Sequence, residues 1–316
     1  MDTAVFTATL GQMVFLLILL AAGFLLVRAK FIQPQAAGVL SKLENMLLIP
    51  AFVMATFLEK FTLETLSTAW KFFLGGFAVA AVFILISIPL VRLCTRDHFL
   101  RRIYLYGLSF SNFGFMGNAV VAAVFPEILP DYLVFTMAFW VLINLWGAPV
   151  LLMGEDAAER PTFGKRMLSL VNPLFVAMVV GILLGVSGWK IPTFVSGAVN
   201  AVGNCMSPIA MLLTGMTVAF IDFRRVFRTG SIWTVTFLRL LAYPLIGIVA
   251  FHFLPFPAVF EQCAVCVLAM PLGLNTVVIP SAYGRDPTAA AGMALVSHAL
   301  SIITIPVMFL LLTNWM

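Results

Sequence analysis

The sequence predicts an all-α membrane protein of ten transmembrane helices, arranged as two inverted repeats of five. Three observations lead to this prediction: the composition, the long charge-free stretches and a duplication within the chain. Hydrophobic residues make up 62% of the chain and charged residues 10%, whereas a soluble domain contains about 25% charged residues. The mean hydropathy is +1.10. This composition places the chain in the membrane class.

Ten spans follow from the hydropathy pattern, because a helix needs about 20 apolar residues to cross the bilayer core. In the first half, spans 1 to 5 cover residues 5–28, 36–58, 69–93, 102–125 and 131–153. In the second half, spans 6 to 10 cover residues 168–187, 194–219, 231–253, 260–283 and 289–313. Span 1 is not predicted to be a cleaved signal peptide, because it is long and Asp2 stands where a basic residue is expected.

A duplication relates the two halves of the chain. Six pairs of prolines, glycines or asparagines recur at an offset of 158 or 157 positions: Gly23 and Gly181, Pro34 and Pro192, Pro50 and Pro208, Asn118 and Asn275, Pro130 and Pro287, and Pro149 and Pro306. The predicted repeats are residues 1–157 and 158–316. Because five spans are an odd number, the second repeat must enter the membrane from the opposite side. Inverted repeats with broken helices are typical of secondary transporters.

The basic residues predict which side of the membrane each loop occupies. Of the 18 Lys and Arg residues, 14 fall in loops that follow odd-numbered spans, and only Lys60, Lys71 and Lys190 fall in the others. Loops rich in Lys and Arg stay in the cytoplasm. We therefore expect a multi-pass protein of the cell (inner) membrane with both termini outside the cytoplasm. The net charge of +5 then reflects topology, and no nucleic-acid partner is expected.

Spans 4 and 9 each contain a helix break at the same position of the repeat. Irregular backbone at this depth is tolerated only where it is buried in protein or lines a polar cavity. The residues of the two breaks are predicted to bind substrate: Asn112, Gly114, Gly117 and Asn118 in span 4, and Pro271, Gly273 and Asn275 in span 9. Asn118 and Asn275 are expected to cap the half-helices that follow, whose N-termini would favour an anion. The alternative is an ordinary kink in each span.

Several runs of this sequence, including the two breaks, resemble those of a known family. The runs Met270–Asn275, Tyr283–Pro287 and Ser301–Pro306 are similar to the C-terminal signature of the auxin efflux carrier family, whose bacterial members are often called malonate-transporter-like permeases. Ser111–Gly117 resembles the first crossover of this family. The resemblance implies a fold like that of bile-acid symporters, with a scaffold of spans 1, 2, 6 and 7. Spans 3–5 and 8–10 would form a transport domain in which spans 4 and 9 cross. It also implies elevator-type alternating access and a homodimer.

Three ionisable residues lie within predicted spans and are candidates for anion or proton coupling. Arg239 in span 8 would either bind an anionic substrate or extend to the cytoplasmic face. His298 in span 10, where the family usually has a small polar residue, would either relay protons or pack as a satisfied core residue. Glu44, near the cytoplasmic end of span 2, would either take part in coupling or be solvated at the interface. Ser301 shares a helical face with Ser297 and Thr304, and this face is expected to line the cavity.

The sequence therefore predicts a secondary transporter of a small organic carboxylate, with its site between Asn118 and Asn275. Uncoupled channels or facilitators and membrane sensors are the alternatives for the same fold. An enzyme is not expected, because no nucleophile–base motif and no phosphate-binding loop occurs. No cofactor or metal is expected either, since the four cysteines have no His or acidic neighbours that would complete a metal site. The predicted partners are the substrate, the lipid bilayer and a second copy of the chain.

Overall fold

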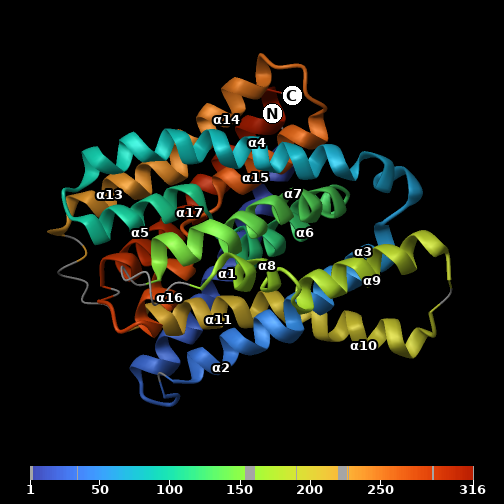
Figure 1. Ribbon diagram of the computed structural model, residues 1–316, viewed down its shortest axis with the longest axis horizontal. Helices are drawn as coiled ribbons and strands as arrows, with labels where there is room; N and C mark the ends of the chain where they lie inside the picture. Colours follow the sequence, from blue (N-terminus) through green and yellow to red (C-terminus); the bar gives the residue numbers. More distant parts are fainter. Residues whose placement is uncertain are drawn as a thin grey trace.

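The computed structural model describes residues 3–33, 35–153, 161–189, 191–219, 226, 228–286 and 288–315. Within these ranges all regular secondary structure is helical, apart from one isolated β-bridge between Ser111 and Leu272. The helices lie side by side in an elongated bundle (Figure 1). The predicted boundary between the repeats, at residues 157 and 158, lies outside the described residues.

Among the described residues, seven helical segments are long and apolar enough to cross a membrane. They are α1 (Thr3–Arg28), α2 (Ala36–Leu43) with α3 (Ile49–Lys60), α4 (Leu63–Cys94), α7 (Leu129–Leu142) with η3 (Ile143–Leu152), α10 (Thr193–Asn204) with α11 (Met206–Val218), α13 (Gly230–Phe237) with α14 (Tyr243–His252), and α17 (Thr288–Trp315). Each coincides with one predicted span. The prediction of an all-α membrane protein is therefore confirmed.

The other three predicted spans contain shorter apolar helices. Span 6 is α9 (Pro173–Ser187), which begins five residues later than predicted because Asn172 caps it and Pro173 occupies its first turn. Span 4 is split into α5 (His98–Ser109) and the continuous segment of η2 (Phe113–Gly117) and α6 (Asn118–Val124). Span 9 is split into α15 (Ala258–Ala269) and α16 (Asn275–Ala282). A short helix, α8 (Phe163–Leu168), precedes α9.

Four of the segments contain a π-helical stretch. Three of these stretches include a proline or end two residues before one: η1 (Glu44–Leu48) before Pro50, η3 (Ile143–Leu152) around Pro149, and η4 (Leu238–Ala242) before Pro244. Proline removes a backbone donor and clashes with the preceding turn, so the helix widens locally instead of ending. Such π-turns are frequent at functional sites, and two of these stretches carry Glu44 and Arg239.

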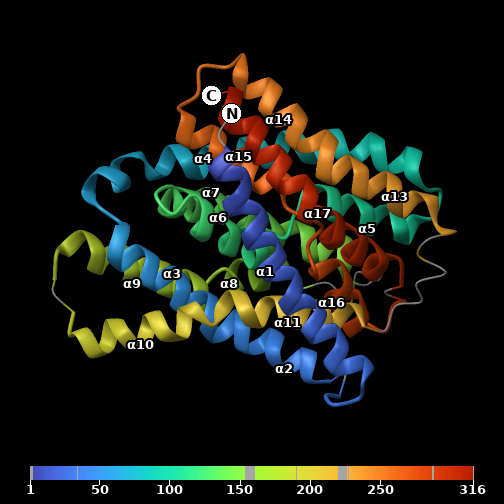
Figure 2. The ribbon, with the colours of Figure 1, turned by 180° about the vertical axis from the view of Figure 1, so that it is seen from behind.

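Two groups of helices are distinguishable in the bundle. Helices α2, α3, α9, α10 and α11 lie on one side, α4, α5, α13, α14 and α15 lie on the other, and both views show this division (Figures 1 and 2). Within the first group α3 packs along α9, and α1 packs along α11 of the same group. Glycines allow these close approaches, because a Cβ on Gly23 would overlap the Leu212 carbonyl of α11.

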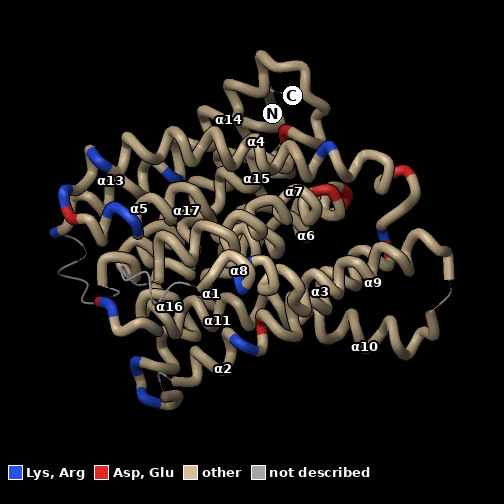
Figure 3. The backbone as a smooth tube through the Cα atoms, in the orientation of Figure 1, with Lys and Arg blue, Asp and Glu red and all other residues tan. Residues whose placement is uncertain are grey.

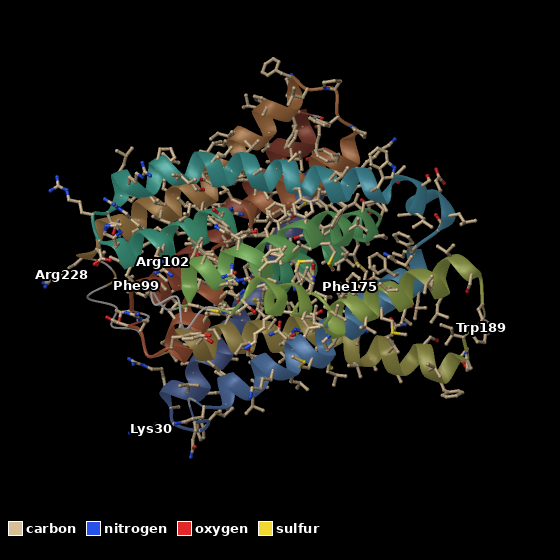
Figure 4. The ribbon with its side chains drawn as sticks, in the orientation of Figure 1. Lys30, Phe99, Arg102, Phe175, Trp189 and Arg228 are labelled. Atoms are coloured by element: carbon tan, nitrogen blue, oxygen red, sulfur yellow. The ribbon has the colours of Figure 1, made fainter. Side chains whose placement is uncertain are left out.

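Most Lys and Arg positions lie toward one end of the bundle, on the left and lower left of the view (Figure 3). Lys30 and Arg228 lie at this end, and Trp189 lies at the opposite one (Figure 4). This distribution agrees with the basic loops predicted from the sequence.

The contact between α1 and α11 gives the first prediction. Replacing Gly23 with Ala should lower the free energy of unfolding by about 2 kcal/mol, because backbone of α11 must move away. Gly11→Ala is the matched control on the same helix, since a Cβ there has no heavy atom within 4 Å. Thermal unfolding in detergent should rank Gly11→Ala at or slightly above the native protein, since Ala favours a helix. Equal destabilisation by both variants would contradict this contact.

Candidate functional site

The two broken segments cross each other at their breaks. Ser111 and Leu272 form an antiparallel β-bridge, and the Asn112 amide donates a hydrogen bond to the Pro271 carbonyl at 2.8 Å. The Ser111 hydroxyl donates to the carbonyl of Val267 in α15 at 2.8 Å. Backbone groups that leave their own helices are thus paired across the crossing. This pairing meets the requirement for irregular backbone at membrane depth.

Arg239 holds the two helix ends that meet at the crossing. Its side chain is 1% exposed. The guanidinium donates to the Leu108 carbonyl at the end of α5 through Nη1 (2.9 Å), and to the carbonyls of Val267 (Nη2, 2.7 Å) and Met270 (Nε, 3.0 Å) at the end of α15. The last carbonyls of a helix lack intrahelical donors and carry partial negative charge. Arg239 therefore supplies hydrogen-bond donors and a compensating positive charge to the C-terminal ends of both α5 and α15.

A cavity of about 320 Å³ borders the crossing, and Arg239 is not part of its lining. Its lining comes from both groups of helices, because Asn45, Ile49 and Val53 of η1 and α3 face residues of the crossing across it. Three helix N-termini border the cavity: the start of η2 at Phe113, the start of α16 at Asn275 and the start of α9 at Pro173. Each N-terminus contributes partial positive charge and backbone N–H groups.

The cavity is rich in amides and carries no formal charge on its described residues. Six of the nine asparagines in the chain line it: Asn45, Asn112, Asn118, Asn144, Asn172 and Asn275. No Asp, Glu, Lys, Arg or His is found among the described lining residues. The cavity therefore offers hydrogen-bond donors and helix dipoles, but no described ion-pair partner.

The amides at the crossing differ in how they are held. The Asn275 side chain donates to the Tyr106 hydroxyl at 3.0 Å. The Asn112 side chain lies 2.9 Å from Nε2 of His298. Asn118 is 3% exposed, and its Oδ1 is buried with no hydrogen-bond partner. The Asn172 side chain caps α9 by accepting from the Phe175 amide at 3.0 Å.

One detail of the predicted breaks is wrong. Neither Asn118 nor Asn275 caps a helix through its side chain: Gly117 and Leu274 occupy the capping positions, and Asn118 lies in the second turn of the helix that starts at Phe113. The glycines of the breaks do not adopt a left-handed backbone, since positive φ among the described glycines occurs only at Gly188 and Gly284. Close packing explains the glycine at position 117, because a Cβ on Gly117 would overlap the Tyr132 hydroxyl.

The predicted site residues divide into those that line the cavity and those that support it. Asn112, Gly114, Asn118, Gly273 and Asn275 line it. Gly117, Pro271 and Ser301 do not belong to its lining. The Ser301 hydroxyl donates to the His298 carbonyl at 2.7 Å, and Ser297 lies 3.3 Å from the Leu272 amide. The expectation that this face of span 10 lines the cavity is therefore wrong: the face contacts the backbone of the crossing at Leu272 and lies outside the cavity lining.

The three ionisable candidates all lie outside the cavity lining. Arg239 is bound to carbonyls, so neither of its predicted roles describes its position. Glu44 is fully buried, and both of its carboxylate oxygens lack a hydrogen-bond partner, which rules out solvation at the interface. His298 is 2% exposed and contacts the cavity only through Asn112.

Sequence reasoning missed Tyr106 and Asn172 as cavity residues. Tyr106 lies in α5, ahead of the break, where it reads as an ordinary aromatic residue of a span. Asn172 precedes Pro173, a pair typical of a helix start, and this signal could have placed a third N-terminus near the site. Asn45 and Asn144 also line the cavity, although a polar residue within an apolar span usually hydrogen-bonds to a neighbouring helix.

A larger cavity of about 740 Å³ lies between α4, α14 and α15. Its lining is mainly apolar, and side chains such as Val82 and Leu254 are about half exposed. Its lining includes neither the breaks, nor the three N-termini of η2, α16 and α9, nor any asparagine. The smaller cavity is therefore the better candidate for a polar solute.

The position of Arg239 gives the second prediction. Arg239→Ala should lower the free energy of unfolding by about 3 kcal/mol or more, because three buried carbonyls lose their donor. Arg239→Lys should fall between Ala and the native protein, since an ammonium lacks the planar fork of donors. Arg92→Ala, at an exposed position of α4, is the control. Thermal unfolding in detergent gives the ranking. Native stability of Arg239→Ala with loss of anion uptake would instead assign Arg239 to the substrate.

Comparison with known proteins gives one match. The family model described as "Membrane transport protein" matches residues 8–309, nearly the whole chain. No curated protein matches the chain. The match agrees with the long apolar helices, and it confirms the resemblance inferred from the sequence. This chain belongs to the auxin efflux carrier-like family of membrane transport proteins.

Proposed function

We propose that the protein is a secondary transporter that moves a small organic carboxylate across the cell membrane. The crossing of the two broken segments is its substrate site. One observation carries the proposal: three helix N-termini and six asparagines line one cavity that has no described acidic residue. Membrane transport itself follows from the family. The substrate class and the mechanism are the parts that we add.

The helix dipoles and amide donors that line the cavity favour an anion over a cation. Helix N-termini and amide N–H groups stabilise negative charge, whereas a desolvated cation requires a carboxylate partner. Glu44, the buried carboxylate nearest in sequence to the lining residue Asn45, is itself absent from the lining. Asn112, Gly114, Asn118, Gly273 and Asn275 are the residues that we assign to substrate binding.

The arrangement of the helices supports elevator-type alternating access. The cavity lies between η1, α3 and α9, which belong to the predicted scaffold, and α5 to α7 and α16, which belong to the predicted transport domain. A transport domain that slides along the scaffold would carry this cavity with it. The proposal includes a homodimer, as the family resemblance implies.

The helix packing also supports ten spans in an inverted repeat. Gly23 of α1 packs against Leu212 of α11, and Gly181 of α9 packs against Met54 of α3. Gly181 follows Gly23 by 158 positions, and Leu212 follows Met54 by the same number. The same contact therefore occurs twice with the two halves exchanged, as a two-fold relation between residues 1–157 and 158–316 requires.

The third prediction tests the anion assignment. Proteoliposomes with the purified protein should take up at least one of malonate, succinate and benzoate, and should discriminate against the matching amides, malonamide, succinamide and benzamide. Asn275→Asp should reduce this uptake about tenfold or more, because a like charge then faces the carboxylate. The fold should persist, since an acidic residue suits the first turn of α16. Asn204→Asp, at an exposed position outside the cavity, is the control.

Equal uptake of acids and amides would contradict an anionic substrate. Counterflow distinguishes a carrier from an uncoupled channel: unlabelled substrate inside the liposomes should accelerate entry of labelled substrate. A flux that lacks counterflow would favour the channel alternative. Uptake of none of the three acids would contradict the proposed substrate class.

The fourth prediction concerns topology. The basic residues gather at one end of the bundle (Figure 3), and we place that end in the cytoplasm. Alkaline phosphatase fused after Met316, which is active only outside the cytoplasm, should therefore be active. Green fluorescent protein at the same site, exported through the general secretory route, should remain dark. The reverse pattern would contradict the predicted orientation of the chain.

A further inference from the structure

His298 is held at both ring nitrogens. Nδ1 lies 2.7 Å from the Ala294 carbonyl one turn earlier in α17, and Nε2 lies 2.9 Å from Nδ2 of Asn112. A carbonyl oxygen can only accept, so Nδ1 carries the hydrogen. Nε2 therefore has a free electron pair, which accepts an N–H of the Asn112 amide. The two hydrogen bonds fix a neutral imidazole in one tautomer.

Asn112 connects this ring to the cavity. It lies at the start of η2 and lines the cavity, whereas His298 does not. Because Nδ2 is directed to the ring, the other end of the amide, Oδ1, remains, and it accepts no hydrogen bond from the described part of the chain. A carbonyl oxygen is an acceptor and repels a carboxylate. In this state Asn112 does not favour an anion in the cavity.

The surroundings of His298 are apolar on its other side. A small cavity there is lined, besides His298, by Met13, Leu16, Leu17 and Leu20 of α1, Met116, Met211 and Ile302. The helices packed against α17 carry these titratable or charged residues: Arg28, His98, Arg101, Arg102, Tyr104, Tyr106, Arg239, Tyr243, His252, Glu261, Cys263 and Cys266. None of them lines this small cavity, and none is hydrogen-bonded to the ring.

A proton on His298 would thus place a positive charge where no described side chain offsets it. A buried unpaired charge is strongly unfavourable. An anion in the neighbouring cavity would supply the missing negative charge. Binding of the proton and binding of the anion are then favourable together and unfavourable alone.

We propose that His298 is the proton-coupling residue of the transporter, and that the Asn112 amide transmits its protonation state to the substrate. This inference rests on the proposed function. One proton passes from a hydronium ion of the solvent to Nε2: an O–H bond breaks, an N–H bond forms, water is left behind, and no other covalent bond changes. Nε2–H is now a donor, so the Asn112 amide turns about its Cβ–Cγ bond until Oδ1 accepts from it. Nδ2 then faces the cavity and donates to the carboxylate. One proton accompanies one negative charge.

The fifth prediction tests this coupling in proteoliposomes that contain the proton indicator pyranine. We use malonate, succinate and benzoate between pH 6 and pH 8. Benzoate is ionised throughout this range, since a simple carboxyl group has a pKa of about 4. The second carboxyl group of malonate and of succinate is partly protonated at the acidic end of the range, so for these two acids each variant is compared with the native protein at the same pH. The apparent affinity of the native protein should rise at least about fivefold from pH 8 to pH 6. Substrate entry should acidify the lumen. His298→Gln, which cannot take up a proton, should abolish the pH dependence and the acidification.

His252→Gln is the matched control, because His252 is exposed and its ring lies beside Phe253 and Trp315, away from the crossing. It should behave as the native protein does. A His298→Gln protein with native pH dependence and native acidification would overturn the proposal. If that variant does not fold, Asn112→Ala should leave residual uptake whose affinity no longer depends on pH, and native pH dependence of Asn112→Ala would overturn the amide link. Failure of the native protein to take up any of the three acids would instead contradict the proposed function.

Discussion

The contact of Arg239 with the carbonyl ends of α5 and α15 is the interaction on which the rest of the site depends. A helix that stops inside a bilayer leaves carbonyls that water cannot reach. Two such ends meet at the crossing, and one guanidinium donates to both. The partial negative charge of the two ends offsets the charge of the arginine. No acidic side chain is needed there, and none contacts the guanidinium within the described residues.

This arrangement separates the two kinds of helix end. The C-terminal ends of α5 and α15 face Arg239, and the N-terminal ends of η2 and α16 face the cavity. The bridge between Ser111 and Leu272 holds the two pairs in register. The Tyr132 hydroxyl, which donates to the Phe113 carbonyl at 3.2 Å, fixes the start of η2 from the side. Positive helix ends can therefore face a solute because the negative ends are already satisfied.

The sequence predicted the seven long apolar segments and the positions of the two breaks, because apolar length and Pro, Gly and Asn are local signals. It could not predict the partners of Arg239, which are carbonyls 28, 31 and 131 residues away. It also misjudged the asparagines. An Asn at a helix start usually caps it, but Asn275 is held by Tyr106 and Asn118 lies beyond the first turn. Ser301 shares a polar helical face, yet that face contacts backbone and not the cavity.

Asparagine is the commonest polar residue of the cavity, and its amide does not titrate. For a carrier that moves its site through the bilayer, this has a consequence for the return journey. A site lined by carboxylates or ammonium groups would need a counter-ion to cross the low-dielectric core once its cargo had left. An amide-lined site with a neutral imidazole behind it needs none. In the proposed transport cycle the unloaded protein would therefore return without a counter-ion, and net accumulation would not require a second solute to travel back.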